Sequence, residues 1–141
     1  MKEASKAAAC GEVPVGAVLV RGGELLASRH DLRESTGDPT AHAEILALRD
    51  GAKKVGNWRL CECEMYVTLE PCPMCAGAMI LARIKRLIYG APNHKFGGVE
   101  THCRLLDITT FNHKVEVTSG VLSEECALPL KKFFREKRSN Q

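Results

Sequence analysis

The sequence predicts an α/β fold built on a mixed five-stranded sheet, and two observations lead to this prediction. Apolar, strand-like runs over residues 13–20 and 25–28 flank Arg21-Gly22-Gly23-Glu24, a hairpin signal that predicts two antiparallel strands. Later in the chain, strand-like runs alternate with segments of helical periodicity, which indicates parallel strands joined by crossover helices. The chain should therefore open with a hairpin and continue as alternating strands and helices.

Each remaining element follows from its local pattern. Residues 40–53 carry Ile45 and Leu48 on one helical face, and Gly51 and Gly56 mark the expected end of that helix. The other expected elements are a helix over 2–10, a polar loop over 31–39, strands over 65–69, 86–90 and 114–118, a helix over 73–83, and a terminal helix from Ser123.

The length of 141 residues fits one domain, so we expect residues 1–141 to form a single unit. A hydrophobic content of 45% and a charged content of 26% are typical of soluble globular proteins. No apolar run reaches membrane-spanning length and no signal peptide is recognisable, so we expect a cytoplasmic protein without membrane partners. The seven cysteines should then be reduced.

Three side chains in two short segments have the chemistry of a zinc site. His42 offers an imidazole, and Cys72 and Cys75 offer two thiolates. Pro71 and Pro73 predict that this Cys-x-x-Cys pair opens a helix, whose positive end favours thiolates. A structural zinc is closed by four protein ligands, whereas a catalytic zinc keeps one position for water. We therefore expect Zn²⁺ as the cofactor, in a catalytic site.

Glu44 lies two residues after His42 and is not needed as a ligand. Two thiolates cancel most of the metal charge and weaken its effect on bound water, so a nearby general base is required. Glu44 is expected to take the proton of the water and later to protonate the leaving group. His-x-Glu followed by Pro-Cys-x-x-Cys is the catalogued signature of zinc nucleobase deaminases.

Positive charge gathers near the C-terminus although the net charge is only +3. Lys131, Arg135 and Arg138 share one face of the expected terminal helix. A surface that contacts phosphates and a solvated helix end both fit this pattern.

Similarity to a known family extends beyond the zinc-binding residues to most of the chain. The segments that carry this similarity are residues 12–18, 38–44, 66–79, 111–113 and 133–135. With them the chain resembles the bacterial tRNA adenosine deaminases of the cytidine-deaminase-like superfamily. The resemblance implies a three-layer α/β/α cytidine-deaminase-like fold with a mixed five-stranded sheet. It also implies a homodimer that converts adenosine to inosine at the wobble position of tRNA. In that reaction a zinc-bound hydroxide attacks C6 while Glu44 moves protons.

The resemblance further implies contacts with the tRNA anticodon loop. Asn93 and Lys95 lie in a loop similar to one that lines the anticodon pocket, and the terminal helix would meet the anticodon loop. The complete set of expected substrate-binding residues is Asp31, Asn93, Lys95, Phe134, Arg135 and Arg138.

Four features depart from the family pattern. Asp31 stands where similar enzymes usually carry an asparagine that hydrogen-bonds the purine, and an ionised carboxylate accepts hydrogen bonds but cannot donate them. The first helix is short, and residues 97–103 differ from the usual small-residue segment. Pro129 removes a hydrogen bond inside the terminal helix and is expected to kink it.

Two other functions are compatible with the sequence. The same zinc core serves deaminases of free guanine or of pyrimidine nucleosides. A non-catalytic zinc module that binds RNA would instead close the metal with a fourth ligand, from Cys63 or His113. A water at the fourth metal position would exclude that module.

Overall fold

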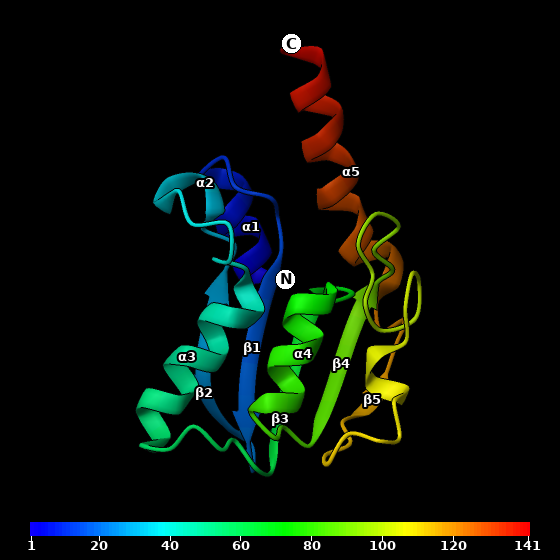
Figure 1. Ribbon diagram of the computed structural model, residues 1–141. Coiled ribbons are helices and arrows are strands. Elements are labelled where there is room, and N and C mark those ends of the chain that lie inside the picture. Colours follow the sequence, from blue (N-terminus) through cyan, green and yellow to red (C-terminus); the bar gives the residue numbers. More distant parts are fainter.

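A hairpin forms one edge of the sheet in the computed structural model, which describes residues 1–141 (Figure 1). β1 (Gly16–Arg21) and β2 (Glu24–His30) pair antiparallel, as the hairpin signal predicted. Gly22 and Gly23 make the turn with φ of 55° and 80°, in the left-handed region that glycine adopts without steric cost.

The strands that follow complete a mixed sheet. β3 (Cys63–Leu69) pairs antiparallel with β1 and parallel with β4 (Arg86–Ala91). β5 (Glu116–Thr118) adds to β4 in parallel, so the strand order is β2-β1-β3-β4-β5. The predicted mixed five-stranded sheet is confirmed. The hairpin makes β1 and β2 antiparallel, and the crossover from β2 to β3 makes those two strands parallel, so β3 is antiparallel to β1, which lies between them.

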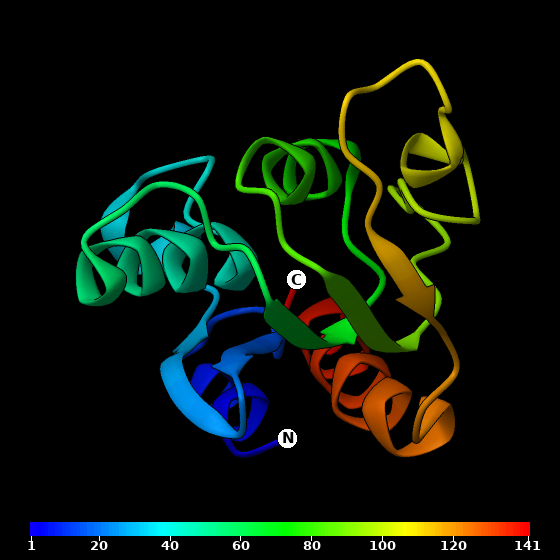
Figure 2. The same ribbon diagram turned by 90° about the horizontal axis from the view of Figure 1, so that it is seen from below.

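Helices cover both faces of this sheet. α3 (Ala43–Val55) and α4 (Pro73–Leu81) lie on one face, and α1 (Lys2–Ala9) and α5 (Ser123–Ser139) lie on the other (Figure 2). A cluster of 22 buried hydrophobic residues joins the layers. The three-layer α/β/α arrangement is therefore the one that the resemblance implied.

Gly51 corrects one expectation about α3. Only Gly56 ends this helix, with a left-handed φ of 76°, whereas Gly51 lies inside it and is buried. A Cβ atom on Gly51 would collide with the side chain of Leu19 on β1. The close approach of α3 to the sheet, and not a helix stop, requires this glycine.

The short first helix is attached to β2 by the buried carboxylate of Glu3. It accepts hydrogen bonds from Lys6 Nζ at 2.9 Å and Ser28 Oγ at 3.0 Å, and it pairs with His30 Nδ1 at 2.8 Å. Burial by itself raises the pKa of Glu3, but the hydrogen bonds with His30, Lys6 and Ser28 outweigh it and lower the pKa to about 2. Glu3 is therefore ionised and holds α1 against the sheet.

One short helix lies where the sequence predicted a polar loop over residues 31–39. α2 (Arg33–Thr36) forms because the buried carboxylate of Glu12 accepts the backbone N–H groups of Glu34 and Ser35, at 3.0 and 2.7 Å. Asp31 Oδ1 accepts the first N–H group of the helix, that of Arg33, at 3.0 Å, but Glu12 is more than twenty positions away in sequence, so the local pattern did not reveal its contribution.

The stretch between β4 and β5 contains one 3₁₀ turn, η1 (Leu105–Asp107). Pro129 lies inside α5, which continues through it to Ser139, with Cys126 and Leu130 buried beside the proline. All seven cysteines are free, as expected. None of the helices combines the length and the apolar character needed to span a membrane.

Candidate active site

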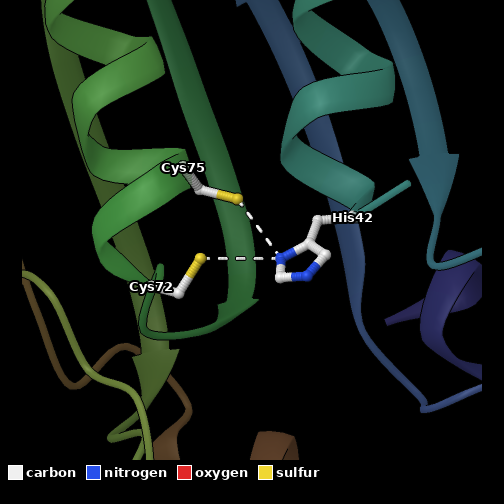
Figure 3. Close-up of side chains that lie close together, drawn as sticks. All are labelled: His42, Cys72 and Cys75. Carbon is white, nitrogen blue, oxygen red and sulfur yellow. Dashed lines mark hydrogen bonds between the residues drawn. The ribbon is translucent and has the colours of Figure 1, made fainter. Parts of the chain in front are cut away.

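The first residues of α3 and α4 form the candidate site, where the two helices begin near each other (Figure 3). His42 is the N-cap of α3 and Cys72 is the N-cap of α4, and both have extended backbones, with ψ of 150° and 170°. Pro73 occupies the first turn of α4, as predicted, and Cys75 follows within that turn. Two positive helix ends therefore flank one small group of side chains.

The donor atoms of this group are spaced for one metal ion. His42 Nδ1 lies 3.6 Å from Cys72 Sγ and 3.4 Å from Cys75 Sγ (Figure 3). All three donor atoms lie within 4.8 Å of one another. Tetrahedral zinc, with Zn–N of about 2.0 Å and Zn–S of about 2.3 Å, requires N···S separations of about 3.5 Å. The residues present therefore fit zinc without rearrangement.

Cys72 is the thiol of the cluster that ionises more readily. A hydrogen bond from the Cys75 thiol, reinforced by His42, lowers the pKa of Cys72 to about 4 despite its burial. The same hydrogen bond raises the pKa of Cys75, and the contact with Cys72 raises the pKa of His42. Binding of a divalent cation releases protons held in such a donor set.

Glu44, the second residue of α3, lies beside the cluster and is only 4% exposed. Its burial raises the pKa of the Glu44 carboxyl group to about 7. A carboxyl group that titrates near neutral pH can both accept and release a proton under ordinary conditions. The site therefore combines a metal-binding cluster with a group suited to proton transfer.

No fourth protein ligand joins the cluster. The chain contains a single group of metal-binding side chains, which consists of His42, Cys72 and Cys75. Cys63 is buried in the hydrophobic core, and His113 Nε2 contacts the backbone oxygen of Ile84 at 2.7 Å. The cluster therefore lacks the four protein ligands that close a structural zinc site.

A cavity of about 590 Å³ opens onto the cluster, a volume in the usual range for small-molecule sites. It brings together most of the residues singled out from the sequence. Those that line it are Asp31, His42, Glu44, Cys72, Asn93, Lys95 and Phe134. Cys75 is fully buried and does not line the cavity.

Asp31 lies in the cavity wall, but its carboxylate is engaged by Arg33. Arg33 Nε donates to both Asp31 oxygens at 3.1 Å, and a terminal nitrogen lies 3.0 Å from Oδ2. Arg33 also lines the cavity, and its side chain is 39% exposed. The pair therefore offers guanidinium donors where Asp31 alone would offer only acceptors. Sequence analysis missed Arg33, because nothing in its local pattern showed that it would face the site.

The loop after β4 forms another wall, in which residues 92–96 line the cavity. Asn93 Oδ1 accepts the backbone N–H groups of Lys95 and Phe96, at 3.2 and 3.0 Å, so this side chain shapes the loop. Lys95 Nζ lies 5.5 Å from the ring centre of Phe134 on α5. Phe96, which the sequence pattern did not single out, is 68% exposed and also lines the cavity.

Arg135 and Arg138 lie outside the cavity. Both are exposed on α5, as is Lys131. The C-terminal part of α5 projects beyond the sheet (Figure 1). The expected substrate contacts are thus divided between the cavity and a separate basic surface on α5.

Comparisons with known proteins agree with this geometry. The sequence profile of the MafB19-like deaminase family matches residues 1–138. The tRNA-specific adenosine deaminase of Bacillus subtilis strain 168 is 50% identical over 141 residues, covering 100% of this chain and 88% of the relative. A structure from a study of A-to-I editing by tRNA:A34 deaminases has a TM-score of 0.88 at 43% identity, over 92% of this chain and 94% of that chain.

A guanine deaminase from Nitrosomonas europaea has a TM-score of 0.79 at 24% identity, covering 94% of this chain and 78% of that chain. At this identity the likeness shows a common fold alone. The family profile matches nearly the whole chain, and the Bacillus relative aligns with all of it, so these two comparisons show the family as well as the fold. The chain therefore belongs to the MafB19-like deaminase family, and within it to the tRNA-specific adenosine deaminases.

Proposed function

We propose that this protein converts adenosine to inosine at the wobble position of a tRNA anticodon, with zinc as its cofactor. The observation that carries the proposal is the three-donor cluster beside buried Glu44, in a cavity large enough for a nucleoside. The relatives named for this reaction on tRNA support the choice of substrate. We further propose that residues 1–141 act as one deaminase domain.

His42, Cys72 and Cys75 would hold the zinc, which when bound activates water for attack on C6 of adenine. Glu44 takes a proton from that water and delivers it to the purine ring. Glu44 then takes the proton of the hydroxyl group now on C6 and passes it to the amino group, which leaves as ammonia. Each turnover consumes one water and releases one ammonia, and it returns Glu44 to its starting state.

The cavity walls would orient the base. Arg33, held by Asp31, offers N–H donors to acceptor atoms of the nucleotide. Lys95 and Phe134 place a cation and an aromatic ring on the opposite wall, and both groups favour a nucleobase with its phosphate.

The basic surface of α5 would contact the anticodon loop outside the cavity. Lys131, Arg135 and Arg138 are exposed there, and Phe134 on the same helix reaches the cavity. One helix can therefore bind phosphates of the loop while its aromatic side chain meets the target nucleotide. A tRNA substrate also implies a cytoplasmic enzyme.

Deamination of free guanine or of a pyrimidine nucleoside is the second candidate, favoured by Asp31 in place of the usual asparagine. The non-catalytic zinc module has less support, because neither Cys63 nor His113 joins the donor cluster.

Inosine mapping on bulk tRNA incubated with the zinc-loaded protein tests the proposed function. We expect inosine at the wobble position of at least one tRNA, and no ammonia release from guanine, cytidine or free adenosine. Turnover of a free base or nucleoside without inosine in tRNA would reject the proposal in favour of a small-molecule deaminase.

A variant that replaces Lys131, Arg135 and Arg138 with glutamine tests the role of α5 in the same assay. Because these side chains are exposed and outside the cavity, the fold and metal content should persist. Removing three phosphate contacts should weaken tRNA binding and flatten its salt dependence by about two to three units of log–log slope. An unchanged salt slope would place the RNA contact elsewhere.

We also propose that the protein forms a homodimer through an apolar surface between α3 and α4. Leu81 is 70% exposed and Trp58 is 54% exposed on this surface. Between them lies a shallow groove lined by Ile45, Leu48, Ala52 and Ala78, among others. A second copy of the chain would cover these side chains, as the family resemblance implies.

Replacing Leu81 with glutamate should convert the dimer to a monomer, because a charge on this surface would lose its water without gaining a partner. Light scattering coupled to gel filtration would measure the mass. Leu128→Glu is the matched control, since Leu128 is also an exposed helical leucine, at 62%, but lies on α5. A Leu81→Glu protein with unchanged dimeric mass would contradict this interface.

A further inference from the structure

Glu70 is a buried acidic residue that the proposed chemistry does not use. It follows β3, precedes the metal-binding Cys72 by two positions, and is 1% exposed. Its side chain accepts five hydrogen bonds, all from the segment that follows β4. The donors are the backbone N–H groups of Asn93 (3.1 Å), Val99 (3.1 Å), Glu100 (2.8 Å) and Thr101 (3.0 Å), and the hydroxyl group of Thr101.

The backbone around Glu70 holds the same segment. Asn93 Nδ2 donates to the Glu70 carbonyl oxygen at 3.4 Å, and Gly98 N–H donates to the Pro71 carbonyl oxygen at 2.8 Å. The loop is therefore attached at Asn93, within its cavity-lining part (residues 92–96), and again at Gly98, just after that part, to the residues that lead directly into Cys72.

Packing at Gly97 and Gly98 shows how closely the loop approaches. A Cβ atom on Gly97 would lie 2.5 Å from both carboxylate oxygens of Glu70. A Cβ atom on Gly98 would lie 2.5 Å from the backbone nitrogen of Pro73, at the start of α4. Any side chain larger than hydrogen would push the loop away from the start of α4.

The hydrogen bonds require an ionised carboxylate at this position. Every partner of the Glu70 side chain is a donor, and an ionised carboxylate is an acceptor on both oxygens. A glutamine would turn an NH₂ group toward some of these donors and leave them unpaired in a buried place, which is costly. A residue with the shape of glutamate but without its charge therefore cannot replace Glu70.

We propose that Glu70 is a positioning residue, which holds the loop of residues 92–101 against the start of α4 and so sets the distance between the substrate-binding wall and the metal-binding cluster. The identity of the substrate rests on the proposed function. The attachment of the loop is a property of the free protein, and it can be measured without substrate.

Glu70→Gln tests the proposal through hydrogen exchange of the backbone amides of Asn93, Val99, Glu100 and Thr101. Loss of their acceptor should speed exchange about 10-fold or more at these amides in the substrate-free protein. The metal content should stay at the wild-type level, because all three donor residues remain. On tRNA, KM should rise about 10-fold with kcat within about 3-fold, the signature of lost uniform binding.

Gly97→Ala tests the same attachment from the loop side, because its methyl group would displace the Glu70 carboxylate. It should reproduce the exchange and KM changes, and the double variant should be no worse than either single one, since both remove one interaction. Glu3→Gln is the matched control. Glu3 is also a buried carboxylate with several partners, but it attaches α1 to β2, so its loss should lower the melting temperature and leave the loop amides and KM unchanged.

Unchanged exchange at the four amides in Glu70→Gln would overturn the proposal, whatever the activity. Loss of metal with intact exchange protection would also overturn it, and would assign Glu70 to support of Cys72 instead. If the wild-type protein does not act on tRNA, the proposed function fails, while faster exchange in Glu70→Gln still supports the positioning role.

Discussion

Glu44→Gln should lower kcat for inosine formation by about 10³-fold or more, in line with the loss of a general acid-base group. Glutamine has nearly the shape of glutamate, so it should fill the same buried position beside the metal-binding cluster. It cannot accept the proton of the attacking water or deliver one to the leaving amine. Single-turnover assays of inosine in tRNA would measure the rate, and metal analysis would measure zinc per chain.

Zinc content and tRNA affinity should remain at wild-type levels in this variant, because Glu44 is not one of the clustered donors. Glu3→Gln again serves as the control for removing a buried carboxylate far from the cavity. A Glu44→Gln protein that deaminates at nearly the wild-type rate would show that another group carries the proton. A variant that loses its zinc would show that Glu44 supports the metal instead.

Cys75→Ala should abolish both zinc retention and deamination. Cys75 is fully buried, and its sulfur lies 3.4 Å from His42 Nδ1, so no outside group can take its place as a donor. Loss of an outer-sphere partner typically weakens metal binding 10- to 100-fold, so loss of a direct ligand should cost more than about 100-fold. Metal analysis after dialysis, with tRNA turnover measured on the same sample, would test this.

Cys63→Ala is the matched control, because Cys63 is also a fully buried cysteine but lies in the hydrophobic core. It should lower the melting temperature through lost packing while zinc content and activity stay at wild-type levels. Zinc loss in Cys63→Ala would instead identify Cys63 as a fourth ligand and favour the non-catalytic module. Full zinc retention in Cys75→Ala would show that the metal is bound at another site.

The metal-binding cluster was predictable because its signals are local. Pro73 marks the start of α4, and the Cys-x-x-Cys spacing places Cys72 and Cys75 within one turn of it. His42 also lies at a helix start, although the sequence predicted that helix to begin at residue 40 and α3 begins at Ala43. The sheet was also predictable, since a glycine-rich hairpin and alternating strands and helices leave few possible topologies.

The residues that sequence analysis missed depend on partners far along the chain. The carboxylates of Asp31 and Glu12 bind the first N–H groups of α2, Glu12 from more than twenty positions away, and this short helix carries Arg33 into the cavity wall. The sequence predicts a helix stop at Gly51, but the approach of α3 to Leu19 is what requires a glycine there. In each case the deciding contact lies across the fold, where local propensity carries no information.

The sequence by itself determined the chemistry available to this protein. Its functional side chains lie in two short segments that mark helix starts, and they are His42, Glu44, Cys72 and Cys75. Only the tertiary structure decided the shape of the cavity around them. Its walls come from α2, the loop after β4 and α5, and buried carboxylates such as Glu70 hold them in place. Such carboxylates need several donors from distant segments, and folding alone brings those donors together.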